Sequence, residues 1–171
     1  MSKLYFEILD QKRKEVFEKL SCFKNRGVLA GGTGVALQLG HRYSYDFDIF
    51  TPKKITKKLF DEVTAVFGKK TKRIVDQTSE LSFITTNSIK VSFVYFPFPV
   101  LHPTIETNSL SLFSLKDLAS NKAYTIGRRG EYRDYVDVFF ILKSGLKLDE
   151  IIKESTKKFS EAFSGRLFLE Q

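Results

Sequence analysis

Two aspartates one residue apart, Asp46 and Asp48, are the side chains of this sequence whose type and spacing point most directly to chemistry. They lie in the segment YSYDFDIF, whose alternation predicts a strand over 45–50 with both carboxylates on one face and Tyr45 on the other. Neighbouring carboxylates in an apolar strand are unfavourable unless the strand end is solvated or a cation binds. Because Mg²⁺ commonly uses one or two carboxylates plus substrate phosphates, the pair predicts a metal site, and two exposed strand-edge aspartates are the alternative.

A pair of glycines, Gly31 and Gly32, precedes the aspartates by about a dozen residues. The apolar residues 28–30 predict a short strand that runs into these glycines, and 33–39 predict a helix ended by Gly40. At such a strand-to-helix turn the free backbone N–H groups can hold a phosphate, which approaches closely because glycine has no Cβ. The pattern is neither a P-loop nor a G-x-G-x-x-G fingerprint, so an ordinary turn is the alternative.

The segment LAGGTGVALQLGHRYSYDFDIFT resembles the signature of the nucleotidyltransferase-like AbiEii/AbiGii abortive-infection toxins, within the DNA polymerase β-type nucleotidyltransferase superfamily. The later segment NKAYTIGRRGEYRDYVDVFFIL is similar to the K…R…RD..D helical segment of that family, and the resemblance covers about 20–143. It implies a mixed sheet core, binding of NTP and of Mg²⁺ or Mn²⁺, and transfer of an NMP group to an acceptor. It also implies an RNA acceptor such as tRNA, a toxin-like function and a cognate antitoxin as partner.

The resemblance assigns roles residue by residue. The implied triphosphate-binding residues are Gly31, Gly32, Thr33, Arg42 and Lys122; the implied metal ligands are Asp46 and Asp48; and Asp134 is the implied late catalytic aspartate. Asp134 would contact the acceptor, the base or Lys122. Arg42 is equally well explained as a surface arginine after a helix cap. For Asp134, Glu131 and Asp137 the alternative is a structural ion network with nearby arginines.

The sequence departs from the family at a third carboxylate, which superfamily members commonly carry on a neighbouring strand. The matching position in IKVSFVYF is Ser92, and a serine is neutral at pH 7 and cannot take a proton from the acceptor. Asp134, Asp76 and Glu80 are the candidates for a replacement acid. Two functions therefore stay open: an active nucleotidyltransferase, or a degenerate fold that binds nucleotide or a partner without turnover. A basic RNA-binding protein would explain the charge but not the aspartate pair.

Composition sets the remaining limits. The 171 residues carry a net charge of +8, which favours polyanionic partners or serves solubility. The single cysteine, Cys22, excludes a disulfide framework and a cysteine metal site. The charged N-terminal segment lacks a signal-peptide core, and no apolar run reaches the roughly 18 residues that span a bilayer. We therefore expect a cytoplasmic protein without membrane contact.

The periodicity of apolar residues predicts an α+β fold in which a mixed sheet is flanked by helices and followed by a helical extension. The predicted helices are 4–23, 33–39, 59–67, 115–126, 132–143 and 149–163, and the predicted strands are 28–30, 45–50, 72–75, 81–85 and 89–96. The segment FPFPVLHP cannot continue a central strand, because proline lacks an N–H donor. It predicts a boundary between a nucleotidyltransferase core over 1–100 and a C-terminal helical region over 101–171 packed on it. Since the family relatives extend further, we expect the chain to be truncated.

Overall fold

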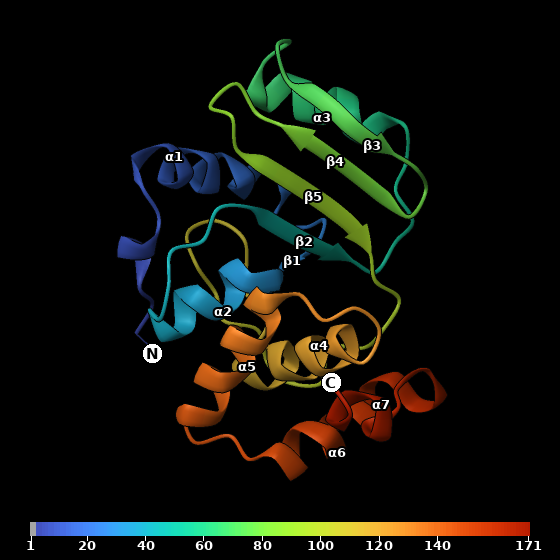
Figure 1. The fold of residues 1–171 in the computed structure, drawn as a ribbon. Coiled ribbons are helices and arrows are strands. Elements are labelled where there is room, and N and C mark those ends of the chain that lie inside the picture. The colour runs from blue at the N-terminus through green and yellow to red at the C-terminus, as the bar shows by residue number, and fades with distance from the viewer. Residues whose placement is uncertain (1–2) are drawn as a thin grey trace.

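A five-stranded sheet in the order β1-β2-β5-β4-β3 forms the centre of the protein, in a computed structural model that describes residues 3–171 (Figure 1). The strands are β1 Val28–Leu29, β2 Phe47–Thr51, β3 Lys72–Asp76, β4 Glu80–Ile84 and β5 Lys90–Tyr95. Strands β2 and β5 are parallel, whereas the other neighbouring pairs are antiparallel. The predicted α+β class with a mixed sheet is confirmed.

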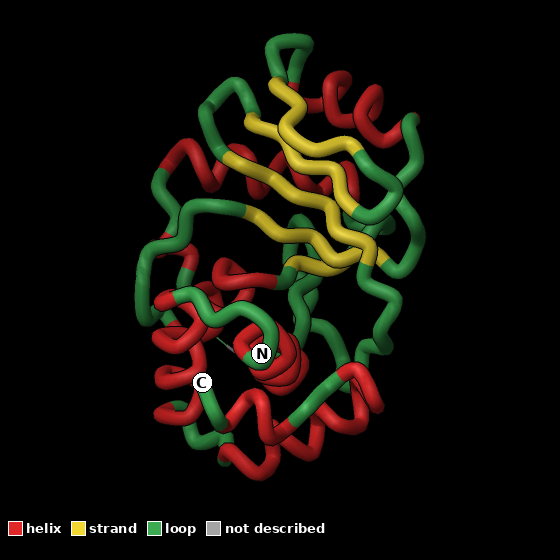
Figure 2. Tube along the Cα trace, turned by 45° about the vertical axis from the view of Figure 1, so that its right-hand side comes forward, coloured by secondary structure: helices red, strands yellow, loops and turns green. Residues whose placement is uncertain are grey.

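The helices lie in two groups around this sheet (Figures 1 and 2). The first group, which covers one sheet face, comprises the 3₁₀ turn η1 Phe6–Ile8, α1 Gln11–Lys19, η2 Leu20–Phe23 and α3 Lys58–Phe67. The second group, which lies beyond the β1–β2 edge, comprises α2 Gly31–Leu39, α4 Leu115–Ile126, α5 Tyr132–Lys143, α6 Leu148–Phe159, η3 Ser160–Ala162 and α7 Gly165–Leu169. No described helix is long and apolar enough to cross a membrane.

Alternation along the strands gives the two sheet faces different chemistry. The face packed against α1 and α3 is apolar and fully buried, and its residues are Phe47, Ile49, Leu81, Phe83, Val91 and Phe93. In the intervening positions lie Asp48 of β2, Ser92 of β5 and Ser82 of β4, which neighbour each other across the sheet. The fold therefore places a polar row on the face opposite the main core.

Several predicted boundaries differ from the structure, and three of the differences have a clear local reason. The helix expected over 4–23 is interrupted, because Asp10 accepts a hydrogen bond from the Arg13 amide at 2.9 Å and so starts α1 afresh. Strand β2 begins at Phe47, so Asp46 and Tyr45 precede it. The last long helix ends at Phe159, because Ser160 has a φ of +49°. The hairpin expected between 81–85 and 89–96 is confirmed by the antiparallel pairing of β4 and β5.

A second apolar cluster joins segments from both sides of the expected 100/101 boundary. Ala30 and Val35, from the strand-to-helix turn and α2, pack in it with residues of α4, α5 and α6. A Cβ on Gly34 would lie 3.3 Å from the side chain of Leu118, so the glycine lets α2 and α4 approach closely. The division into a core and a helical region stays a prediction.

A fully buried ion pair anchors α6 to α4. The Lys158 ammonium donates to the Asp117 carboxylate at 2.7 Å and lies 4.8 Å from the Phe113 ring centre. Burial alone would raise the pKa of Asp117, but hydrogen bonds from Lys158 and from the Leu101 and His102 amides outweigh it and hold that pKa below its ordinary value. Each charge therefore offsets the unfavourable burial of the other, and the pair is stable only when both side chains are present.

We expect Lys158→Met to lower the free energy of unfolding by about 3–5 kcal/mol, because it leaves a buried carboxylate without its cation. Asp117→Asn combined with Lys158→Met should recover most of this loss. Urea unfolding measures both. The matched control is Arg73→Met, which breaks the exposed Arg73–Asp76 pair and should cost less than about 1 kcal/mol. Equal losses for the two single variants would contradict a structural role for the buried pair.

Candidate active site

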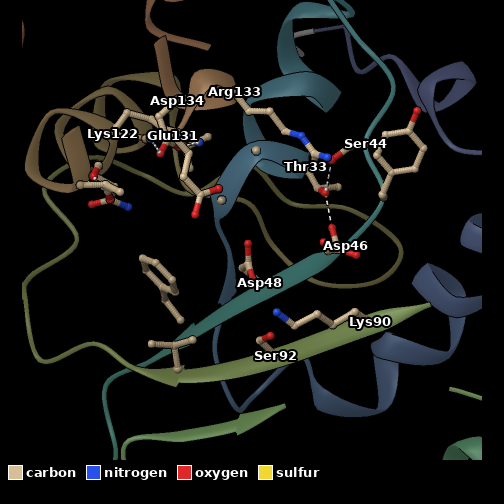
Figure 3. Close-up of a pocket in the computed structure, with 18 of the residues that line it drawn as sticks. Thr33, Ser44, Asp46, Asp48, Lys90, Ser92, Lys122, Glu131, Arg133 and Asp134 are labelled. Atoms are coloured by element: carbon tan, nitrogen blue, oxygen red, sulfur yellow. Dashed lines mark hydrogen bonds and ion pairs between the residues drawn. The ribbon is translucent and has the colours of Figure 1, made fainter. Parts of the chain in front are cut away.

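A pocket of about 450 Å³ opens between the polar sheet face, the start of α2, and helices α4 and α5 (Figure 3). It brings together the glycine turn and the aspartate pair that the sequence singled out. The charges of its lining balance, because it contains five basic and five acidic side chains. The basic residues are Arg42, Lys90, Lys122, Arg129 and Arg133, and the acidic residues are Asp46, Asp48, Glu80, Glu131 and Asp134. The surplus of positive charge in the chain therefore lies outside this pocket.

The glycine turn is shaped by its contact with Asp48. Gly31 has a φ of +61°, and a Cβ at this position would collide with the Asp48 carboxylate. The Ala30 amide donates to the Asp48 carbonyl at 2.8 Å, which fixes the turn against β2. Because α2 starts at Gly31, the first backbone N–H groups of the helix lie at the pocket without intrahelical acceptors. This arrangement suits an anion.

The side chain of Thr33, an expected triphosphate-binding residue, is hydrogen-bonded inside the protein. Its hydroxyl lies 2.6 Å from the Ser44 hydroxyl and donates to the Asp46 carbonyl. The side chain is buried and therefore holds the loop that precedes β2. Only the backbone amide of Thr33 is available as a phosphate donor.

Asp46 and Asp48 are both half-buried and line the same pocket. Burial raises the pKa of the Asp48 carboxyl above its ordinary value, and the charge of Asp46 raises it further, whereas Lys90 and Lys122 oppose the shift. Within the described part of the chain the Asp48 carboxylate accepts no hydrogen bond. Two adjacent carboxylates that repel each other fit a single hard cation, which would relieve the repulsion.

Ser92 occupies the position in the sheet where a third carboxylate was expected. Ser92 lies directly beside Asp48, in register between β5 and β2. Its hydroxyl is hydrogen-bonded to the Ser82 hydroxyl at 2.8 Å, and Ser82 in turn donates to Glu80 at 2.5 Å. Among residues 3–171 no group of three acidic, histidine or cysteine side chains converges to hold a metal. The aspartate pair therefore lacks a third carboxylate ligand.

Lys122 is held in a buried ion network. Its ammonium contacts Asp134 at 2.7 Å and Asp137 at 2.8 Å. Asp137 is fully buried and also receives hydrogen bonds from His41 at 2.8 Å and from Arg42 at 2.7 and 2.9 Å. Although burial would raise its pKa, hydrogen bonds from His41 and Arg42 and the charge of Lys122 hold the pKa of Asp137 far below its ordinary value.

This network gives two of the expected site residues protein partners of their own. Arg42 borders the pocket, but two of its guanidinium nitrogens are bound to Asp137 and the third donates to the Tyr43 carbonyl. The Asp134 carboxylate binds Lys122 and also accepts from the Glu131 amide at the start of α5. The contact expected between Asp134 and Lys122 is therefore present, and it is combined with a capping role.

Several residues that line the pocket, among them Lys90 and Asn121, were given no role from the sequence, and Tyr45 was placed on the wrong side. Lys90 precedes Ser92 by two residues, so the alternation of β5 could have placed it on the polar face. Its ammonium is directed toward Asp48 (Figure 3) and has no ion-pair partner among the described residues. Tyr45 was expected opposite the aspartates, but it lies in the loop before β2, 48% exposed, with the Arg13 guanidinium 5.0 Å from its ring.

We expect Asp48→Asn to stabilise the protein at pH 7 when no divalent ion is present, because it removes a carboxylate whose pKa is raised. A raised pKa means that the folded state binds the proton more tightly than the unfolded chain, so wild-type stability at this site falls as the pH rises through that pKa. The gain from the substitution should therefore shrink as the pH is lowered. Urea unfolding between pH 4 and 8 tests this, with Asp76→Asn as control; a variant less stable than wild type at pH 7 would refute it.

Comparisons with known proteins show what this chain is similar to in sequence and in fold. An uncharacterized protein of Aquifex aeolicus is 33% identical over 159 residues, covering 88% of this chain and 76% of that protein. JHP933 of Helicobacter pylori has a similar structure, with a TM-score of 0.60, 20% identity and coverage of 90% and 76%. The nucleotidyltransferase toxin MenT4 of Mycobacterium tuberculosis has a TM-score of 0.61, 15% identity and coverage of 84% and 61%.

The two solved structures show the same fold as this chain at low sequence identity. The family itself is shown by a sequence match that extends over residues 17–168 and includes both the glycine–aspartate block and the Lys122–Asp137 segment. The chain belongs to the nucleotidyl transferase AbiEii toxin family of type IV toxin–antitoxin systems.

Proposed function

We propose that this nucleotidyltransferase is Mg²⁺-dependent and moves an NMP group from an NTP to a hydroxyl of an RNA acceptor such as tRNA. In this transfer the acceptor oxygen forms a bond to the α-phosphorus, and pyrophosphate leaves. The observation that carries the proposal is the convergence of the Gly31–Gly32 turn and the Asp46–Asp48 pair on one pocket. An antitoxin protein is the further partner that membership of the family supports.

Different residues of the pocket would bind the triphosphate, the metal ion and the acceptor. The N–H groups at the start of α2 would bind the triphosphate, and Asp46 and Asp48 would hold the Mg²⁺. The ion, when bound, neutralises charge on the phosphates. Lys90, which faces Asp48, and Arg133, which lines the same pocket, have no ion-pair partner among residues 3–171, so both could meet a phosphate or the acceptor. Lys122 uses two of its three N–H donors on Asp134 and Asp137, which leaves the third for a phosphate.

A binding module without turnover is the second candidate, and Ser92 is the observation that favours it. Only two carboxylates lie where a superfamily member commonly has three, so NTP and one ion could bind while the acceptor is left without a base. Glu80 is the acidic residue of the neighbouring strand that lines the pocket, whereas Asp76 is paired with Arg73. Glu80 would thus be the replacement acid nearest to the polar row.

Incubation with each NTP, labelled at its α-phosphate, together with Mg²⁺ and total tRNA should yield labelled RNA. Asp48→Asn should reduce both Mg²⁺-dependent NTP binding and labelling to background, because it removes one of the two metal ligands. Binding is measured separately by calorimetry, and Asp76→Asn is the matched control. If the wild type binds NTP but labels neither RNA nor protein, the enzyme proposal fails and the binding-module function replaces it.

Asp134→Asn separates a proton-accepting role from a positioning role. A general base contributes roughly 10²–10⁴ in rate, and its loss leaves NTP affinity nearly unchanged. Because Asp134 holds Lys122 at 2.7 Å and caps α5, we expect the substitution to change NTP affinity together with transfer. Asparagine keeps a carbonyl oxygen that can accept from the Glu131 amide, so the capping contact should persist and the loss should fall on the ion pair with Lys122. A drop in rate alone, with affinity and stability unchanged, would instead identify Asp134 as the base.

A further inference from the structure

Helix α4 presents one continuous face to the pocket. Leu118, Asn121, Lys122 and Thr125 all line it, at the three- and four-residue spacing that places side chains on the same side of a helix. Lys122 is engaged by Asp134 and Asp137. The Thr125 hydroxyl donates to the Asn121 carbonyl at 2.9 Å, within the helix itself. The polar side chain on this face that remains to be explained is that of Asn121.

The carboxamide of Asn121 is buried and unsatisfied. The residue is only 8% exposed, and within residues 3–171 neither its Oδ1 nor its Nδ2 has a hydrogen-bond partner. Buried side-chain amides in folded proteins nearly always find partners, because an unpaired donor or acceptor away from water is unfavourable. An unpaired amide in the wall of a ligand pocket therefore indicates a contact that forms only with the ligand.

Apolar side chains from the sheet and from α4 accompany Asn121 in the pocket wall. Phe50 of β2, Val94 of β5 and Leu118 of α4 line the same cavity that holds the aspartate pair. Phe50 and Val94 lie on the same sheet face as Asp48 and Ser92, further along their strands. The pocket lining thus includes apolar surface and one buried amide, a composition that suits a planar, partly polar group.

We propose that Asn121 hydrogen-bonds the edge of the nucleobase of the bound NTP. This inference rests on the proposed function. A phosphate would satisfy the Nδ2 donor but would repel the Oδ1 acceptor. The two ribose hydroxyls could together satisfy both atoms, but the apolar side chains of Phe50, Val94 and Leu118 in the pocket lining favour a flat base over a hydrated sugar. A base edge offers a donor beside an acceptor and satisfies both, as carboxamides do when they bind bases in pairs of hydrogen bonds.

The experiment measures binding without any RNA acceptor, by calorimetry in Mg²⁺. The ligands are ATP, GTP, CTP and UTP, ribose 5-triphosphate, which lacks the base, and inorganic tripolyphosphate. The variant is Asn121→Leu, which keeps the shape of the side chain and removes both polar atoms. The matched control is Ser120→Ala, which removes a hydroxyl of α4 that donates to the Lys116 carbonyl within the helix and does not line the pocket.

Asn121→Leu should weaken the best-bound NTP roughly 10- to 100-fold, the loss of one bidentate base contact, and leave ribose 5-triphosphate and tripolyphosphate unchanged. It should melt, without ligand, at or above the wild-type temperature, because it removes an unpaired buried amide. Ser120→Ala should bind all ligands as the wild type does. An equal loss for NTP and ribose 5-triphosphate would overturn the base contact, and a lower melting temperature with uniform weakening would identify a structural role.

Failure of this inference is distinct from failure of the proposed function. A wild type that binds an NTP, with an Asn121→Leu variant that binds it equally well, would overturn the base contact and leave the nucleotidyltransferase proposal intact. A wild type that binds neither NTP nor tripolyphosphate would overturn both.

Discussion

The buried carboxylate of Asp137 is the interaction on which the rest of the site depends. It belongs to α5, receives hydrogen bonds from His41 and Arg42 in the segment after α2, and contacts the Lys122 ammonium of α4. Three chain segments are thereby fixed to one charged group that has no access to solvent. Because loss of any partner would leave a buried charge uncompensated, the network holds α2, α4 and α5 in one arrangement.

That arrangement decides which charges remain for a ligand. Arg42 and Asp134 match the family pattern, but their charged groups are largely satisfied inside the protein. Lys90 and the aspartate pair have fewer protein partners for their charges. Asp48 lies beside Asp46, has a raised pKa, and accepts no hydrogen bond on its carboxylate from the described residues. A protein that keeps repelling carboxylates in a pocket sacrifices stability there, which is typical of sites that bind cations.

The polar row Asp48–Ser92–Ser82 shows how a single substitution changes the chemistry of the sheet surface. Hydroxyls at the second and third positions link the row to Glu80 through hydrogen bonds. They keep the surface neutral where a further carboxylate would add to the repulsion around Asp48. The arrangement lowers the negative charge available for metal ions, and it leaves the handling of the acceptor proton to groups outside this row.

The sequence by itself determined the strand-to-helix glycine turn and the alternation that separates Asp48 from the core residues, whereas the departure at Ser92 came from the family resemblance. These features depend on local backbone chemistry and on period-two patterning, which a sequence displays directly. Family resemblance added Lys122 and Asp134. Only the tertiary structure decided that the Thr33 hydroxyl supports a loop and that the Arg42 guanidinium pairs with Asp137, because these contacts join residues from separate elements.

The same reason explains why Lys90 and Asn121 were missed. Each is an ordinary polar residue in its own strand or helix, and its meaning comes from what lies opposite it in space. Lys90 matters because it faces Asp48, and Asn121 because the packing of α4 buries its amide in the pocket wall without a partner. Long-range packing, which no local pattern encodes, decides whether a polar side chain is satisfied within the protein or left for a ligand.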